Sequence, residues 1–266
     1  MSDLPVRPNG ATLPVPCTTV IPPPDYQGAM NKWTQHQLPN LELCIAFLNG
    51  EEADRKFVME TANEWVEQVD LAHERMREVL QSQSTLQRHR LWLRFKWLNV
   101  DPATQVDLST AHIRINFGTE SLSCIGSDAL SVVSPAPTMH LSLHTDPNHP
   151  KWQKAWRRNH VLHEFGHALG LLHEHQLPQR HPLLRDKVIA YYTPQMGEKA
   201  AKFVEKNILP IYSNGQVTYV HGLRYDPDSI MIYQLHRDWL ENPSEANVSV
   251  LPFVVSLHYP DVSICR

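Results

Sequence analysis

Residues 163–174 of this chain read HEFGHALGLLHE, and this stretch decides which fold and which chemistry to expect. His163 and His167 are four positions apart, so on a helix they lie on one face, one turn from each other. Two imidazoles placed in this way can share a metal ion. Glu164 lies about 100° further round such a helix, where it can reach a water molecule at the metal without being a ligand. The pattern predicts a metal site beside a carboxylate.

The third histidine of the stretch, His173, can join the other two only if the helix ends before it. On a continuous helix it would lie about 15 Å along the axis from His163. Gly170 supplies the break, because glycine adopts the left-handed conformation at a helix end without the steric cost of a Cβ atom. Three neutral histidines leave a tetrahedral zinc ion with one open position, as in catalytic zinc sites. The sequence therefore predicts one catalytic zinc ion bound by His163, His167 and His173, with Glu164 as the catalytic base.

Histidine is abundant in this chain, which has 16 in all. Two of them, His160 and His175, flank the stretch. By position alone His160 and His175 could also belong to a metal cluster. Because the three-histidine set is already complete, we predict that neither of these two binds the metal.

The same residues resemble a known family, the metzincin metallopeptidases, and within it the astacin-like group. The extended motif of that group, H-E-x-x-H-x-x-G-x-x-H-E, is matched at every fixed position from His163 to Glu174. Further along, residues 229–233 read SIMIY and resemble the family's methionine-containing turn, S-x-M-x-Y. The resemblance implies that Met231 forms an apolar floor beneath the histidines and that Tyr233 hydrogen-bonds the oxyanion of the transition state. It also implies that Gly170 and Glu174 support the site.

The chain departs from the family at several points, so the way in which its activity would be kept latent stays open. Ile232 stands where astacin-like proteins usually have histidine between the methionine and the tyrosine. Secreted members carry a signal peptide, a propeptide and two disulfides, and the four cysteines here do not map onto those bridges. Cys17 could cap the zinc as a thiolate, since thiolate is a good zinc ligand, or it could be an unremarkable residue of the N-terminal segment.

The order of predicted elements indicates an α+β fold with a mixed sheet. Residues 1–35 are rich in proline and are expected to form an extended tail or a pro-like arm that packs no core. An apolar run at 41–48 predicts a strand, and a long amphipathic helix follows, with Asn49 as its cap. Further strands are expected at 91–97, 111–117 and 138–143, and helices at 156–170 and near 197–208. By resemblance, residues 36–266 form a two-lobed metzincin-like domain with a first, upper lobe to about residue 173, an irregular lower lobe from about 174, and 138–143 as the substrate-binding edge strand.

Composition narrows the function further. A formal net charge of −4 argues against a nucleic-acid partner, and no stretch approaches the roughly 20 apolar residues of a membrane span. The N-terminus lacks the apolar core of a signal peptide, so we expect a cytoplasmic location, without excluding secretion by another route. The prediction is a zinc endopeptidase that acts on a protein or peptide substrate. Two alternatives stay open: a metal-binding interaction module or latent pseudo-peptidase, and a metallohydrolase of small amides.

Overall fold

The computed structural model describes Trp33 and residues 41–80, 92–101, 103–143, 150–178, 180–212, 229–232 and 235–241. Its strands are β1 (Glu42–Phe47), β2 (Arg94–Trp97), β3 (Ile113–Phe117), β4 (Leu122–Ser123) and β5 (Met139–Leu141). Its α-helices are α1 (Glu52–Leu80), α2 (Pro150–Ala168), α3 (Arg185–Met196) and α4 (Lys199–Asn207). Short 3-10 helices lie at η1 (Leu108–Thr110), η2 (Gly126–Ser131), η3 (Glu174–Gln176) and η4 (Arg237–Trp239).

The five strands form one mixed sheet in the order β2-β1-β3-β5-β4. Only β4 runs antiparallel to its neighbour. Ile45 lies between Trp97 and Ile113, and Ile115 lies beside Met139. Because side chains alternate along a strand, these apolar residues all point to the same face. That face therefore carries the main core of the protein.

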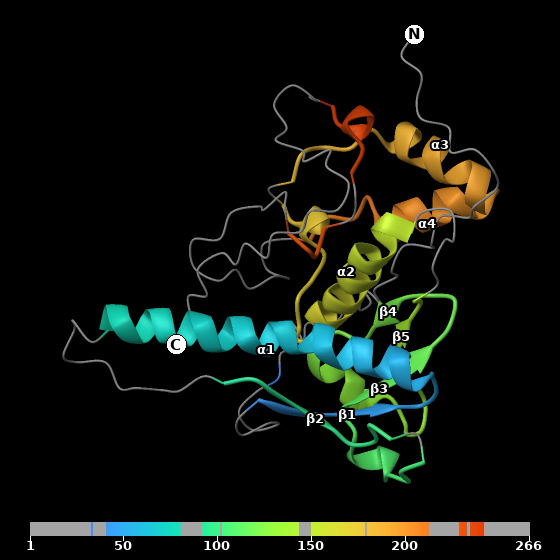
Figure 1. Ribbon diagram of the computed structural model, residues 1–266. Coiled ribbons are helices and arrows are strands. Elements are labelled where there is room, and N and C mark those ends of the chain that lie inside the picture. The colour runs from blue at the N-terminus through green and yellow to red at the C-terminus, as the bar shows by residue number, and fades with distance from the viewer. Residues whose placement is uncertain are drawn as a thin grey trace.

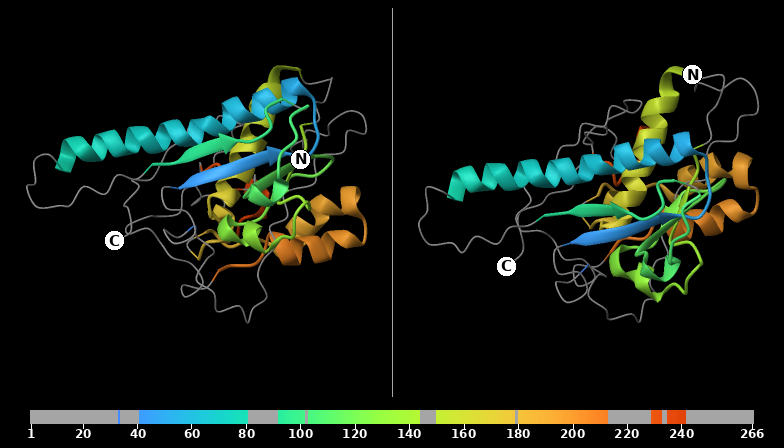
Figure 2. Two further views of the ribbon diagram at one scale, coloured as in Figure 1. Left: turned by 90° about the horizontal axis from the view of Figure 1, so that it is seen from below. Right: turned by 60° about the horizontal axis from the view of Figure 1, so that its bottom comes forward.

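The two long helices cover this apolar face. Both views of Figure 2 show α1 lying along one face of the sheet. Helix α2 crosses it, and the Phe165 ring centroid lies 5.3 Å from that of Phe95 on β2. Trp65 of α1 donates its indole N–H to the carbonyl of Leu162 on α2, at 3.0 Å. The histidine-bearing helix is thus packed against both α1 and the sheet.

The opposite face of the sheet is closed by the chain that follows η2. Arg114 on β3 is buried, and its guanidinium donates to the carbonyls of Ala111, Val132 and Ala136. Three carbonyl partners compensate for the loss of water around this cation.

A second core lies beyond the zinc-motif helix. Figure 1 shows α2 extending from the sheet towards α3 and α4. An antiparallel bridge between Leu183 and Leu240 ties this part together. The buried side chains of the second core are those of Leu183, Val188, Tyr192, Ala200, Phe203, Val204, Ile208, Leu235, Trp239 and Leu240. The first core belongs to the first lobe and this one to the second lobe, so the predicted two-lobed α+β architecture is confirmed.

The prediction that residues 138–143 form the edge strand of the sheet is wrong. Strand β5, within the expected segment 138–143, pairs with β3 on one side and with β4 on the other. The edge is β4, which has only two residues, Leu122 and Ser123. A strand of this length shows no alternation that a sequence pattern could reveal.

The predicted helix cap is also wrong. Asn49 accepts a hydrogen bond from the N–H of Phe117 and donates one to its carbonyl, at 2.6 and 3.0 Å. Helix α1 begins three residues later, at Glu52. Asparagine favours caps because its short side chain bonds nearby backbone groups, and here those groups belong to β3.

Other boundaries differ modestly from the prediction. The strands are shorter than predicted, helix α2 begins six residues earlier than expected, and helix α3 was not predicted at all. Trp33 lies in the segment expected to pack no core, yet it is buried in the first core. No helix in the described part of the chain is long and apolar enough to cross a membrane.

Candidate metal centre

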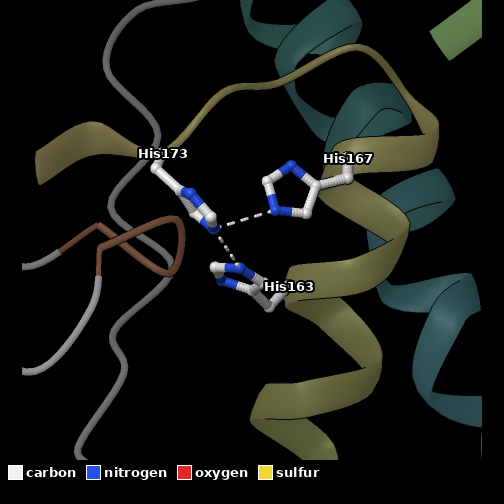
Figure 3. Close-up of side chains that lie close together, drawn as sticks. All are labelled: His163, His167 and His173. Atoms are coloured by element: carbon white, nitrogen blue, oxygen red, sulfur yellow. Dashed lines mark hydrogen bonds between the residues drawn. The ribbon is translucent and has the colours of Figure 1, made fainter. Parts of the chain in front are cut away.

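Three histidines converge at the end of α2. The Nε2 atom of His173 lies 3.1 Å from the Nε2 atom of His163 and 3.1 Å from that of His167. Figure 3 shows His163 and His167 projecting from successive turns of the helix, and His173 reaching them from the chain that returns. All three side chains are buried. The structure thus brings together the three ligands that the motif predicts.

The other nitrogen of each ring decides what this cluster can hold. His163 Nδ1 lies 2.8 Å from the carbonyl of Ile230, and His167 Nδ1 lies 2.8 Å from the carbonyl of Leu171. A carbonyl only accepts, so both Nδ1 atoms carry the proton and both Nε2 atoms present lone pairs. The side chain of Gln176 bonds to His173 in a way that raises the pKa of that histidine, as an acceptor does. Lone pairs this close repel one another unless a cation lies between them, and imidazole nitrogen is a preferred zinc ligand.

Burial keeps these rings in the form that binds metal. It lowers the pKa of His163 and His173 well below the ordinary value, and it lowers that of His167 to about 4. The neighbouring histidines act in the same direction on His163 and His173. All three are therefore neutral near pH 7, which metal binding requires. The donor set fits one zinc ion.

The turn after α2 returns the chain to the site. Gly170 has a φ of 102°, a left-handed conformation that glycine adopts without strain. Its N–H donates to the carbonyl of His167 at 2.8 Å, and the N–H of Leu171 donates to that of Gly166 at 2.9 Å. These two bonds form a Schellman motif. Gly170 therefore ends the helix where the sequence predicts.

The methionine-containing turn lies directly against the zinc-motif helix. Met231 is buried, and a Cβ atom added to Gly166 would lie 2.4 Å from its sulfur. The carbonyl of Ile230 accepts from His163, and the carbonyl of Met231 accepts from the N–H of Glu174 at 2.9 Å. The turn thus contacts the site through the first histidine and through the residue after the third.

Two residues of the site were missed by sequence reasoning. Gly166 is a variable position of the motif, and only its contact with Met231 shows why a side chain would not fit. Gln176 is fully buried; it bonds to His173, donates to the carbonyl of Asn207 and accepts from the hydroxyl of Tyr212 at 3.1 Å. The sequence shows only a polar residue three positions after the last ligand, and its burial becomes visible in the structure alone.

The remaining predicted residues divide into two groups. Glu164 is fully buried on α2 next to His163, and Glu174 begins η3 directly after His173. Tyr233 and Cys17 lie outside the described residues, so their proposed roles stay predictions.

The two histidines predicted not to bind the metal have other partners. His160 Nδ1 lies 3.0 Å from the carbonyl of Trp156, and His175 Nε2 lies 3.2 Å from the carbonyl of Asn207. The metal cluster found among the described residues comprises only the three motif histidines.

A two-lobed α+β fold, a three-histidine site at a helix end and a methionine turn against that helix agree with the resemblance to the astacin-like metzincins. Among solved structures, one of myroilysin is 28% identical, covers 80% of this chain and 84% of that chain, and has a TM-score of 0.56.

Two further structures match less closely. A crystal structure of myroilysin is 25% identical, covering 88% of this chain and 82% of that one, with a TM-score of 0.46. High choriolytic enzyme 1, a hatching enzyme zinc-protease from Oryzias latipes (Medaka fish), is 14% identical, covering 80% and 81%, with a TM-score of 0.41. No model of a protein family and no curated protein matches the chain.

Proposed function

We propose that this protein is a zinc endopeptidase that hydrolyses protein or peptide substrates. The observation that carries the proposal is the convergence of three Nε2 lone pairs beside the fully buried Glu164. A structural zinc site fills all four positions with protein ligands, whereas three histidines leave one position open.

The residues of the chain divide the chemistry among them. The chemistry that a bound zinc ion supplies is to lower the pKa of water towards neutrality and to polarise the scissile carbonyl. Glu164 accepts a proton as water attacks that carbonyl, and then delivers the proton to the leaving amine. Tyr233 donates a hydrogen bond to the developing oxyanion. Met231 and Gly166 hold the helix and the turn in contact beneath the histidines.

A peptide substrate is supported by the position of β4. Leu122 of this edge strand packs against the second core, so β4 lies where the two lobes meet. It also contacts α2, which bears two of the ligands. Among the described strands β4 pairs only with β5, and an extended peptide that pairs with its other edge would continue the sheet.

Glu164→Gln tests this proposal, because it keeps the volume of a buried side chain and removes the base. We expect kcat to fall about 10²- to 10⁴-fold while the zinc content stays at one ion per chain. Cleavage of a peptide library, followed by mass spectrometry, and zinc analysis of the same sample give the two readouts. A variant as active as the wild type would contradict the role of Glu164.

The same assay separates the alternatives. A wild type that binds zinc and cleaves neither the library nor a denatured protein would be an interaction module or a latent pseudo-peptidase. Cleavage of small amides without cleavage of peptides would indicate the third class. A chain lacking residues 1–30, compared with the full chain, shows whether the proline-rich arm inhibits, and this truncation leaves Trp33 in place.

A further inference from the structure

Each of the last four carbonyl groups of helix α2 has a hydrogen-bond partner. The last four carbonyls of an α-helix lack partners within the regular helix. Here those of Phe165, Gly166 and His167 accept from the N–H groups of the following turn, at 2.8–2.9 Å. The carbonyl of Ala168 accepts instead from the indole N–H of Trp33, at 2.7 Å and 135 positions away along the chain. A tryptophan from the N-terminal segment therefore completes the cap of the zinc-motif helix.

Trp33 is held firmly enough to serve this purpose. It is 9% exposed and belongs to the first core. Its ring meets the edge of His112 at a centroid distance of 5.7 Å and an interplanar angle of 77°. His112 is itself fixed, because its Nδ1 accepts from the N–H of Cys44 on β1 at 2.8 Å. The indole thus connects the sheet to the end of α2.

The capped carbonyl lies inside the turn that sets the metal geometry. Ala168 follows the second ligand, His167, and precedes Gly170 by two positions. The ring of His167 bonds across this turn to the carbonyl of Leu171. If the indole N–H is lost, a buried carbonyl either stays without a partner or rotates towards another donor, and rotation moves the residues between the second and third ligands.

We propose that Trp33 is a positioning residue of the metal site, which fixes the turn between His167 and His173 through the carbonyl of Ala168. The proposal rests on the metal site of the proposed function and does not require peptide hydrolysis. It also implies that Trp33 belongs to the folded domain. Proteolytic removal of the arm would therefore keep the metal site intact only if the cut lies before residue 33.

The test is Trp33→Phe in the full-length chain, which keeps an aromatic ring and deletes the N–H. Loss of a group that orients a metal ligand typically weakens metal binding 10- to 100-fold, and we expect about tenfold for this indirect contact. Zinc affinity is measured by competition with a chelator, and the visible spectrum of the cobalt-substituted protein reports the coordination geometry. The melting temperature of the zinc-loaded form should fall more than that of the metal-free form.

Two matched controls separate positioning from packing. Trp97→Phe makes the same change in a ring of β2 that packs on Phe165 of α2, but the indole N–H of Trp97 has no hydrogen-bond partner among the described residues. We expect this variant to lose stability and to keep its zinc affinity. Replacement of Trp33 by 3-benzothienylalanine keeps the bicyclic shape without the N–H, and tests the bond if Trp33→Phe fails to fold.

The zinc affinity and the two melting temperatures together decide whether Trp33 positions the turn or only packs. Zinc affinity within twofold of the wild type, with equal losses of melting temperature in the metal-free and zinc-loaded forms, would make Trp33 a packing residue and overturn the proposal. A wild type that binds no zinc would instead remove the proposed function, which is a distinguishable result.

Discussion

The two halves of helix α2 are held in different ways. In the N-terminal half, Arg158 bonds to both carboxylate oxygens of Glu64 on α1, and Arg157 lies 2.5 Å from Asp54. These ion pairs are partly exposed; the side chains of Arg158 and Glu64 are 29% and 28% accessible. In the C-terminal half, the carbonyls of Ile230 and Leu171 accept from the two histidine rings, and the distant Trp33 caps the carbonyl of Ala168. We infer that the first half attaches the helix and the second half determines the metal geometry.

Removal of a ligand in the second half should have the largest effect. His167→Ala leaves two histidines, and we expect the protein to lose its zinc on dialysis and to show no rise in melting temperature when zinc is added. His160→Gln is the matched control from the preceding turns, since His160 bonds to a carbonyl of its own helix. The control should keep one zinc ion per chain. Equal zinc content in both variants would contradict the assigned ligand set.

Acid should destabilise the metal-free protein through the same buried rings. In the fold the pKa of His167 is about 4, whereas an unfolded histidine titrates near 6.5. As the pH falls from about 6.5 to 4, the unfolded chain binds protons that the native state does not bind, so the free energy of unfolding decreases. We expect about 1.4 kcal/mol per pH unit for each buried histidine. Urea unfolding of the metal-free protein at several pH values measures the slope.

A ligand variant sharpens this measurement. His167→Ala should reduce the acid slope by about one histidine, while the depressed pKa values of the other buried histidines keep part of it. A wild-type slope near zero over this window would show that the rings are already protonated or are exposed in the metal-free protein.

A smaller effect is expected where α2 meets the methionine turn. Gly166→Ala places a methyl group 2.4 Å from the sulfur of Met231, and the sulfur must move. Overpacking of this kind costs about 1–3 kcal/mol, against roughly 1 kcal/mol gained from the better helix propensity of alanine. We expect lower stability and weaker zinc binding, because the turn also bonds to His163.

A double variant tests the cause. Met231→Ala alone leaves a cavity, but combined with Gly166→Ala it removes the sulfur that the new methyl group would meet. The two changes together should therefore cost less than the sum of their separate costs. Additive losses would show that the methyl group is accommodated without contact with Met231.

The sequence could predict the ligand set because local backbone geometry specifies it. Four-residue spacing fixes His163 beside His167, and a glycine at the right position allows the chain to return with His173. The α+β class followed from periodicity and from the family resemblance. Each of these signals is contained in a short window of sequence.

The parts that could not be predicted depend on contacts between distant segments. Asn49 matches a helix cap locally, yet its partner is Phe117 on β3. Trp33 reads as part of a proline-rich arm, and its partner Ala168 is 135 positions away. Gly166 looks variable until Met231 is seen against it. No local pattern contains these partners, so no local pattern could reveal them.

The smallest effect is expected in the N-terminal half of α2. Arg158→Met removes the pair with Glu64 and keeps much of the apolar stem of the side chain. Partly exposed ion pairs are worth about 0–1 kcal/mol, so the free energy of unfolding should fall by no more than this. Zinc affinity should be unchanged, because no bond to the histidines or to their turn passes through Arg158 in the described structure. Chemical unfolding with and without zinc, compared with Gly166→Ala under the same conditions, measures both quantities. If Arg158→Met weakened zinc binding as strongly as Gly166→Ala, attachment to α1 would itself set the metal geometry, and the division of α2 into two halves would be wrong.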